Sequence, residues 1–222
     1  QTCTRTLSNN SMEKITYLIF SNLKTNIMSK YRGPRLRVIR RLGKLPGLTQ
    51  KIPKRNTRPG QHGTSRRKPT QFSYRLIEKQ KLRFYYGISE KQLIRYIKEV
   101  QRIKGPTGQI LLQKLEQRLD NIVYRLGWAP TLPSARQLVT HGHVLVNQKN
   151  INIPRYTCVI YDIINVQNKS KIHNLIETTY LQNHIRKIPA HLSLRTENLT
   201  ATINQKVNRS DILLPLNELL II

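Results

Sequence analysis

Acidic residues and cysteines are scarce in this chain of 222 residues. The chain holds 11 Asp and Glu against 39 Lys and Arg, which gives a formal charge of +28. Like charges oppose compaction, so an excess of this size predicts a polyanionic partner, either nucleic acid or an anionic membrane surface. Apolar segments are short as well: no run exceeds four residues, as in Tyr17–Phe20, whereas about 20 span a bilayer. We therefore expect no membrane partner.

The two cysteines, Cys3 and Cys158, lie far apart and form no CxxC motif. A structural zinc site normally takes four closely spaced Cys or His ligands, and a disulfide framework needs more thiols than these. His141 and His143 flank a glycine, but no thiol lies nearby. We expect no metal and no cofactor.

Aspartate is rarer still, with Asp120, Asp162 and Asp211 as the only three. No glycine-rich phosphate loop follows an expected strand, and no carboxylate pair or Ser/His/Asp set has a useful spacing. The sequence leaves open a catalytic set whose members come together only in the folded protein. We expect no catalytic residues and no enzyme.

The positive charge is concentrated in the first half of the chain. Residues 28–104 hold 23 Lys and Arg against three Glu, whereas residues 105–166 hold six basic and three acidic side chains. Bulk electrostatic attraction therefore belongs to the first half. Any specific recognition by the middle must come from a few placed side chains.

Residues 1–27 differ from the rest, being rich in Ser, Thr and Asn. They are interpreted as a targeting segment, a lineage-specific extension or an over-extended gene model. Met28 opens a basic block and is expected to be the functional start.

Proline and glycine recur throughout residues 29–72. Proline lacks a backbone donor and glycine adds conformational freedom, so one short helix over residues 35–44 is the most we expect there. The rest is interpreted as a basic arm that becomes ordered on RNA, the alternative being a disordered solubilising tail. Tyr31, Phe72 and Tyr74 alternate with Arg and could stack on unpaired bases.

Hydrophobic periodicity predicts three helices after the arm, over about residues 74–86, 89–104 and 107–126. Gly87 is expected to cap the first helix, and Ser89 with Gln92 forms a capping box for the second. Four cations on the first helix are candidate phosphate contacts: Arg75, Lys79, Lys81 and Arg83.

Residues 118–166 predict a compact module of two helices and a hairpin. Ser134 is expected to cap a short helix that ends at Gly142, and alternation from Val144 predicts a strand followed by a turn at residues 147–150. A strand over residues 163–166 would close a small sheet. Cations near the helical part would form a charged edge suited to phosphate: Arg118, Arg125 and Arg136. The alternative is that Arg118 and Asp120 are ordinary surface charges and that His141 and His143 simply end a helix.

Residues 118–166 resemble the RNA-binding module first recognised in small-subunit ribosomal protein number four. Three more blocks resemble the plastid form of that family: Tyr31–Arg35 with Arg40–Thr49, Glu78–Gly87 and Asn217–Ile222. The resemblance runs from Met28 to Ile222. Some bacterial relatives carry a cysteine cluster in the arm, and this chain has none there, so zinc is not implied.

This resemblance implies an α+β fold, in which a helical domain with a basic amino-terminal arm precedes a small helix-helix-β-hairpin RNA-binding module. The expected parts are an extension (1–27), the arm and helical domain (28–117), the module (118–180), and a carboxy-terminal segment that packs back on the helical domain (181–222).

The resemblance also implies a structural constituent of the small ribosomal subunit, located in a plastid (chloroplast) and not a homo-oligomer. Family members bind the five-prime domain of the ribosomal RNA, nucleate assembly of the subunit body, touch small-subunit protein number five, and influence decoding accuracy together with number twelve. By position, the RNA-facing side of the module would hold Arg118, Arg136, Gln137, His141 and His143. The amino-terminal RNA contact would hold Arg32, Arg35, Arg40 and Arg41.

Two alternatives remain. One is a free regulatory RNA-binding protein that uses the same module, which sedimentation with ribosomal subunits would distinguish. The other is an RNA-modifying enzyme that carries the module as an appendage, which a turnover assay would reveal.

Overall fold

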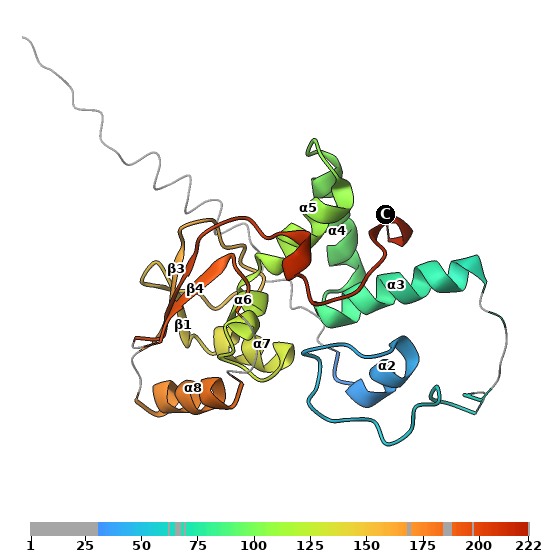
Figure 1. The fold of residues 1–222 in the computed structure, drawn as a ribbon, viewed down its shortest axis with the longest axis horizontal. Coiled ribbons are helices and arrows are strands. Elements are labelled where there is room, and N and C mark those ends of the chain that lie inside the picture. Colours follow the sequence, from blue (N-terminus) through green and yellow to red (C-terminus); the bar gives the residue numbers. More distant parts are fainter. Residues whose placement is uncertain are drawn as a thin grey trace, which may run out of the picture. The chain divides into compact units, whose positions relative to one another are not determined.

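A computed structural model describes residues 31–61, 63–64, 68, 70–167, 170–183, 188–196 and 198–221. The expected extension over residues 1–27 lies outside them. Helices and an antiparallel sheet make up the described part, so the α+β class is confirmed (Figure 1). The α-helices are α2 (Arg35–Leu42), α3 (Gln71–Tyr85), α4 (Glu90–Gln101), α5 (Thr107–Glu116), α6 (Leu119–Arg125), α7 (Leu132–Thr140) and α8 (Ser170–Asn183). The strands are β1 (Val144–Val146), β2 (Lys149–Asn150), β3 (Ile163–Val166), β4 (Leu192–Arg195) and β5 (Thr200–Ile203), and two 3-10 turns are η1 (Arg209–Asp211) and η2 (Glu218–Leu220).

The short helix predicted over residues 35–44 is confirmed as α2. Val38 and Leu42 on its apolar side are buried, and so are Leu45 and Leu48 in the chain that follows. Between α2 and α3, none of the described residues belongs to a helix or strand. The high content of proline and glycine explains this, because neither residue supports a long regular element.

Helices α3 and α4 begin at side-chain caps. Thr70 caps α3, which therefore starts three residues before the predicted position. The capping box predicted at the start of α4 is confirmed: Ser89 Oγ accepts from the Gln92 amide at 3.4 Å, and Gln92 Oε1 accepts from the Ser89 amide at 3.4 Å. Gly87 lies between the two helices at φ 51°, a left-handed conformation that glycine adopts without strain.

The single helix predicted over residues 107–126 is wrong, because the chain breaks into α5 and α6. Arg118 is extended (φ −70°, ψ 138°) and forms an isolated antiparallel bridge with Thr157. The Cys158 amide donates to the Gln117 carbonyl at 2.9 Å, and the Leu119 amide donates to the Tyr156 carbonyl at 2.9 Å. The helix ends here because a distant segment of the chain supplies the hydrogen bonds that a continuous helix would make internally.

Helix α7 begins at Leu132 and is capped by Thr131, not by the predicted cap Ser134. The Thr131 side chain accepts from the Ser134 amide at 3.3 Å, and Pro133 lies in the first turn, where its missing donor is harmless. Gly142, at φ 75°, follows the end of the helix as predicted.

The sheet has the order β2-β1-β3-β5-β4, and every neighbouring pair is antiparallel. Val144 pairs with Val166, and Ile164 pairs with Ala201, so one face is continuous and buried across the three central strands. The turn predicted over residues 147–150 spans only two residues. Asn147 and Gln148 alone form it, both at positive φ, and no described strand follows β2 before β3.

The sheet extends past the module boundary expected at residue 180. Strands β4 and β5 complete the sheet. Strand β3, which was predicted to close the sheet at its edge, is therefore its central strand. The chain after β5 then contacts the helical part: Gln113 Nε2 donates to the Val207 carbonyl at 3.0 Å, and the Asn217 amide donates to Glu78 at 3.2 Å. Residues 32–221, where described, form one compact unit with a continuous core that includes Trp128.

Candidate nucleic-acid interface

Among the described residues, no cation of the arm or of α2 takes part in an ion pair. No Asp or Glu occurs between Glu13 and Glu78. In the described part of residues 31–75, ten basic side chains are exposed: Arg32, Arg37, Arg41, Lys44, Lys51, Lys54, Arg55, Arg58, Lys68 and Arg75. Their counter-charge must come from solvent ions or from a bound polyanion.

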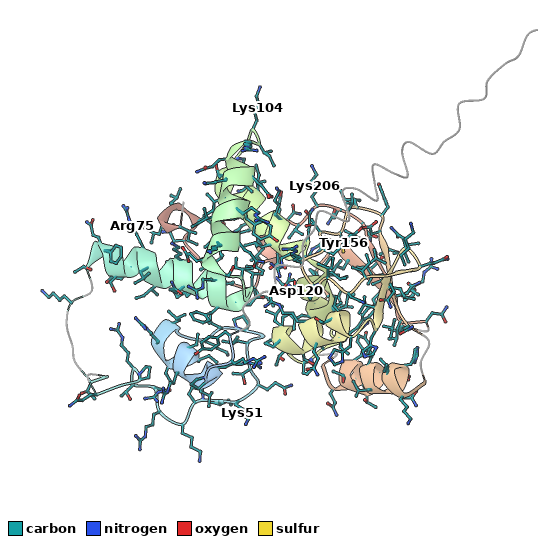
Figure 2. The ribbon with its side chains drawn as sticks, turned by 180° about the vertical axis from the view of Figure 1, so that it is seen from behind. Lys51, Arg75, Lys104, Asp120, Tyr156 and Lys206 are labelled. Atoms are coloured by element: carbon teal, nitrogen blue, oxygen red, sulfur yellow. The ribbon has the colours of Figure 1, made fainter. Side chains whose placement is uncertain are left out.

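Four of the predicted site residues belong to this region. Arg32 and Arg41 are exposed, while Arg35 and Arg40 are half-buried. Arg40 shapes the arm, because its Nε donates to the Thr57 carbonyl at 2.9 Å and its guanidinium also reaches the Arg58 carbonyl at 3.4 Å. These contacts hold a loop of the arm against the end of α2. Figure 2 shows Lys51, in the same arm, pointing away from the rest of the molecule.

Of the four cations predicted on α3, three already form ion pairs with carboxylates and one does not among the described residues. Arg75 is exposed and has no ion pair among the described residues. Lys79 and Arg83 both reach Glu90 of α4, Arg83 at 3.7 Å, and Lys81 pairs with Glu78 at 2.6 Å. Arg75 is therefore the α3 cation with the most freedom to meet a phosphate.

The expected surface position of Arg118 and Arg125 is wrong. Arg118 has no exposed surface, and Arg125 is 6% exposed. Arg118 Nε and Nη2 donate to the two Asp120 oxygens at 3.1 and 2.8 Å, while Arg125 donates in the same two-pronged way to Glu116 at 3.1 and 2.9 Å. A buried charge needs such a partner, and these two guanidinium groups are used inside the protein.

Arg136 joins three elements of the fold. Its Nε donates to Asp120 Oδ2 at 2.7 Å, its Nη1 donates to the Gly87 carbonyl at 2.7 Å, and its Nη2 donates to the Tyr86 carbonyl. The side chain is only 16% exposed. We call these contacts of Arg136 with Asp120, Tyr86 and Gly87 the Arg136 latch.

Burial and charge oppose each other at Asp120, which is buried and is labelled near the centre of the view in Figure 2. Burial alone would raise the pKa of the Asp120 carboxyl, but the guanidinium groups of Arg118 and Arg136 outweigh it, and the pKa lies below its usual value. Burial alone would lower the pKa of Arg118, but the Asp120 carboxylate outweighs burial, and the pKa of Arg118 lies above its usual value. The cluster is therefore ionised in the folded protein.

A second buried polar cluster surrounds Glu116. Its carboxylate accepts from Arg125, from the Tyr86 hydroxyl at 2.6 Å and from the Asn121 amide. Burial and the Glu116 charge raise the pKa of Tyr86 well above its usual value. The phenol therefore stays a hydrogen-bond donor to Glu116.

The remaining predicted residues of the module lie where α7 meets β1. Gln137 and His141 are exposed, and His143 is half-buried. The rings of His141 and His143 lie edge to face with centroids 5.8 Å apart. Together with Arg136 at its edge, this is the part of the predicted module surface that the structure leaves accessible.

Two family models match consecutive parts of the chain. The ribosomal protein S4/S9 N-terminal domain matches residues 30–116, and the S4 domain matches residues 117–164. The small ribosomal subunit protein uS4c of Rhodomonas salina is 54% identical over 195 residues, covering 88% of this chain and 96% of that protein. This chain belongs to the uS4 family.

Plastid and cyanobacterial relatives are similarly close. The uS4 protein of Thermosynechococcus vestitus is 52% identical over 195 residues, with 88% of this chain and 96% of that protein covered. The uS4c protein of Prototheca wickerhamii is 54% identical over 203 residues, with 88% and 97% covered. The family consists of ribosomal proteins and not of enzymes, which removes the RNA-modifying enzyme from the alternatives.

Neither a metal cluster nor a membrane helix occurs in the described part of this uS4 chain. No group of three or more His, Cys, Asp or Glu residues there could hold a metal ion. No described helix has the length and apolar character that crossing a bilayer requires.

Sequence reasoning missed one set of cations on α4. They are exposed and follow one another at spacings of three and four residues, the last at the C-cap of the helix: Lys91, Arg95, Lys98 and Arg102. The periodicity of basic residues within the predicted helix would have revealed them.

Proposed function

We propose that this chain is a structural constituent of the small ribosomal subunit that binds ribosomal RNA through its arm, α2, α3 and the α7–β1 corner of the S4 domain. The observation that carries the proposal is the stretch between Glu13 and Glu78 without any carboxylate, in which ten described cations are exposed. A phosphate backbone supplies the missing counter-charge, and release of its condensed counterions favours binding.

The proposed contact residues are those whose charge or hydrogen-bonding groups remain accessible. In the arm and on α2 and α3 they are Arg32, Arg35, Arg40, Arg41 and Arg75, with Lys79, Lys81 and Arg83 at the flank of α3. In the S4 domain they are Gln137, His141 and His143, and Arg136 of the same helix ties that helix to Asp120. Arg118 and Arg125 are excluded because they are buried.

Recognition by such a surface is mainly recognition of shape. Folded RNA presents phosphates, 2′-hydroxyls and unpaired bases, whereas its major groove is too narrow for side chains to read. The helical part and the S4 domain are held together by the Arg136 latch and the Glu116 cluster. Two surfaces fixed in this way can hold two RNA helices at a set angle.

The family resemblance supports finer proposals. The RNA partner is the five-prime domain, binding occurs early and nucleates assembly of the subunit body, and the bound protein touches small-subunit protein number five and influences decoding accuracy with number twelve. The plastid relatives support a chloroplast location, although the cyanobacterial relative at 52% identity is almost as similar.

Sedimentation tests the proposal directly. The chain should co-migrate stoichiometrically with small subunits through a high-salt wash. The logarithm of its affinity for isolated five-prime-domain RNA should fall linearly with the logarithm of the salt concentration. A free regulatory protein would bind RNA in the same salt-dependent way but leave the subunits in the wash. Absence of the chain from small subunits purified from the organelle would overturn the proposal.

A further inference from the structure

Helix α4 presents a row of cations on the side opposite its core contacts. With 3.6 residues per turn, Lys91, Arg95, Lys98 and Arg102 lie within an arc of about 60° around the helix axis. Leu93 and Val100, which are completely buried, lie on the opposite side. The rise of 1.5 Å per residue gives the row a length of about 16 Å. We call these four residues the α4 stripe.

The acidic residues of α4 do not neutralise the α4 stripe. Glu90 is bound by Lys79 and Arg83 of α3, and Glu99 is bound by Lys114 of α5 at 3.3 Å. Both carboxylates of the helix therefore face its neighbours. Within the described part of the chain, no member of the α4 stripe takes part in an ion pair.

The α4 stripe continues into the exposed tip of the α4–α5 hairpin. All residues from Gln101 to Pro106 are exposed, and Lys104 adds a fifth cation there. Figure 2 shows Lys104 at this tip, well apart from Arg75 on α3 and from Lys51 in the arm. The hairpin therefore offers a cationic edge separate from the surface already proposed.

We propose that the α4 stripe, with Lys104 at its end, binds the sugar-phosphate backbone of an RNA helix as a contact separate from the arm and the S4 domain. This inference rests on the proposed function and extends it to a surface that neither the sequence motifs nor the family match assigns. A straight row of unpaired, solvent-exposed cations matches a line of phosphates. It contacts backbone and carries no base-specific readout.

The separate location of this edge has a mechanical consequence. A protein that grips RNA at the arm, at the α7–β1 corner and at the α4 hairpin restrains the RNA at three points of one compact unit. Loss of the third contact should weaken binding without changing which sequence is bound.

The test compares two variants with the same loss of charge. In the stripe variant, Lys91, Arg95, Lys98 and Arg102 are all replaced by Gln, which retains helix propensity. In the matched control, four exposed cations outside any proposed interface are replaced by Gln: Lys149, Lys171, Arg195 and Lys206. Circular dichroism confirms that both variants fold.

Binding of the full chain to five-prime-domain RNA is then measured between about 50 and 200 mM salt. The stripe variant should lose at least about tenfold in affinity, and its salt slope should shrink by about 3 to 4, since each phosphate contact contributes close to one unit. The control should lose clearly less and retain most of its slope.

Three outcomes overturn the inference. Equal losses in both variants would mean that only net charge matters, and an unchanged stripe variant would mean that α4 touches no RNA. A stripe variant that binds free RNA normally but is released from assembled subunits would point to an acidic protein surface instead. Failure of the unmodified chain to bind the RNA would be a different result, because it would overturn the proposed function as well.

Discussion

The guanidinium group of Arg136 donates to the main-chain carbonyl of Gly87 at 2.7 Å, and so α7 is joined to the turn between α3 and α4. A Cβ placed on Gly87 would lie 3.0 Å from the Arg136 Cζ and closer still to its Nη1. Glycine is therefore needed at this position for two reasons: the positive φ of 51° and the approach of the guanidinium. The contact links the helical part of the chain to the S4 domain.

Replacing Gly87 by Ala should open the Arg136 latch. The left-handed φ alone costs about 1–2 kcal/mol for a residue with a Cβ, and displacement of the guanidinium should add about 1–3 kcal/mol. Chemical denaturation measures the sum. The matched control is Gly87→Ala in an Arg136→Ala background, where the backbone φ is the same but the added Cβ meets no guanidinium. Equal losses in the two backgrounds would show that the contact with Arg136 contributes nothing.

Arg136 itself should act through stability more than through direct RNA contact. Arg136→Ala leaves Asp120 with one guanidinium partner and two carbonyls without their donor, and we expect a loss of about 3 kcal/mol in the free energy of unfolding. Gln137→Ala and His141→Ala remove exposed side chains of the same helix end and should leave this free energy within about 0.5 kcal/mol.

RNA binding separates these roles. The Gln137 and His141 variants should bind five-prime-domain RNA more weakly at full stability, while the Arg136 variant should lose binding together with stability. An Arg136→Ala protein that keeps the wild-type unfolding free energy and still binds weakly would place Arg136 in the interface itself.

The buried pair of Glu116 and Arg125 allows a double-mutant cycle. Arg125→Met leaves a buried carboxylate without its cation and should cost about 3–5 kcal/mol, and Glu116→Gln should cost a comparable amount by leaving Arg125 unpaired. The double variant should be more stable than the sum of the two losses implies, because no unpaired charge remains. Strictly additive losses would contradict the direct pairing.

Stability should also depend on pH through His191. This side chain is buried; burial lowers its pKa below the usual value, although Asp211 at 3.5 Å works in the opposite direction. Because the unfolded chain binds a proton at a higher pH, around 6.5, than the folded chain does, the stability is complete above that pH and falls as pH drops through the window below it.

His191→Gln should remove this dependence. Unfolding free energies of the wild type should fall between about pH 7.5 and 5.5, by no more than about 1.4 kcal/mol per pH unit for this one group, and the variant should show a flatter profile. The pKa of Asp120 is lowered, so its contribution is lost only near and below pH 4 and does not confuse the comparison. A variant with the same slope as the wild type would exclude His191 as the cause.

Local sequence signals identified several elements correctly. The capping box at Ser89 depends on two residues three positions apart, and the hairpin strand β1 depends on alternation within a few residues. By contrast, Thr131 and Ser134 are both good caps, and the choice between them depends on how the preceding loop packs. The break at Arg118 was invisible locally, because the hydrogen bonds that end α5 come from residues about 40 positions further along.

By itself, the sequence determined the sign of the charge, its concentration before residue 104 and the need for a polyanion, since these follow from counting residues. Only the tertiary structure decided which cations can meet that polyanion. Arg118 and Arg125 have the same chemistry as Arg41 and Arg75, yet packing places carboxylates beside the first two and solvent beside the others. The physical reason is that burial and charge pairing depend on contacts between residues distant in the chain, which no local pattern encodes.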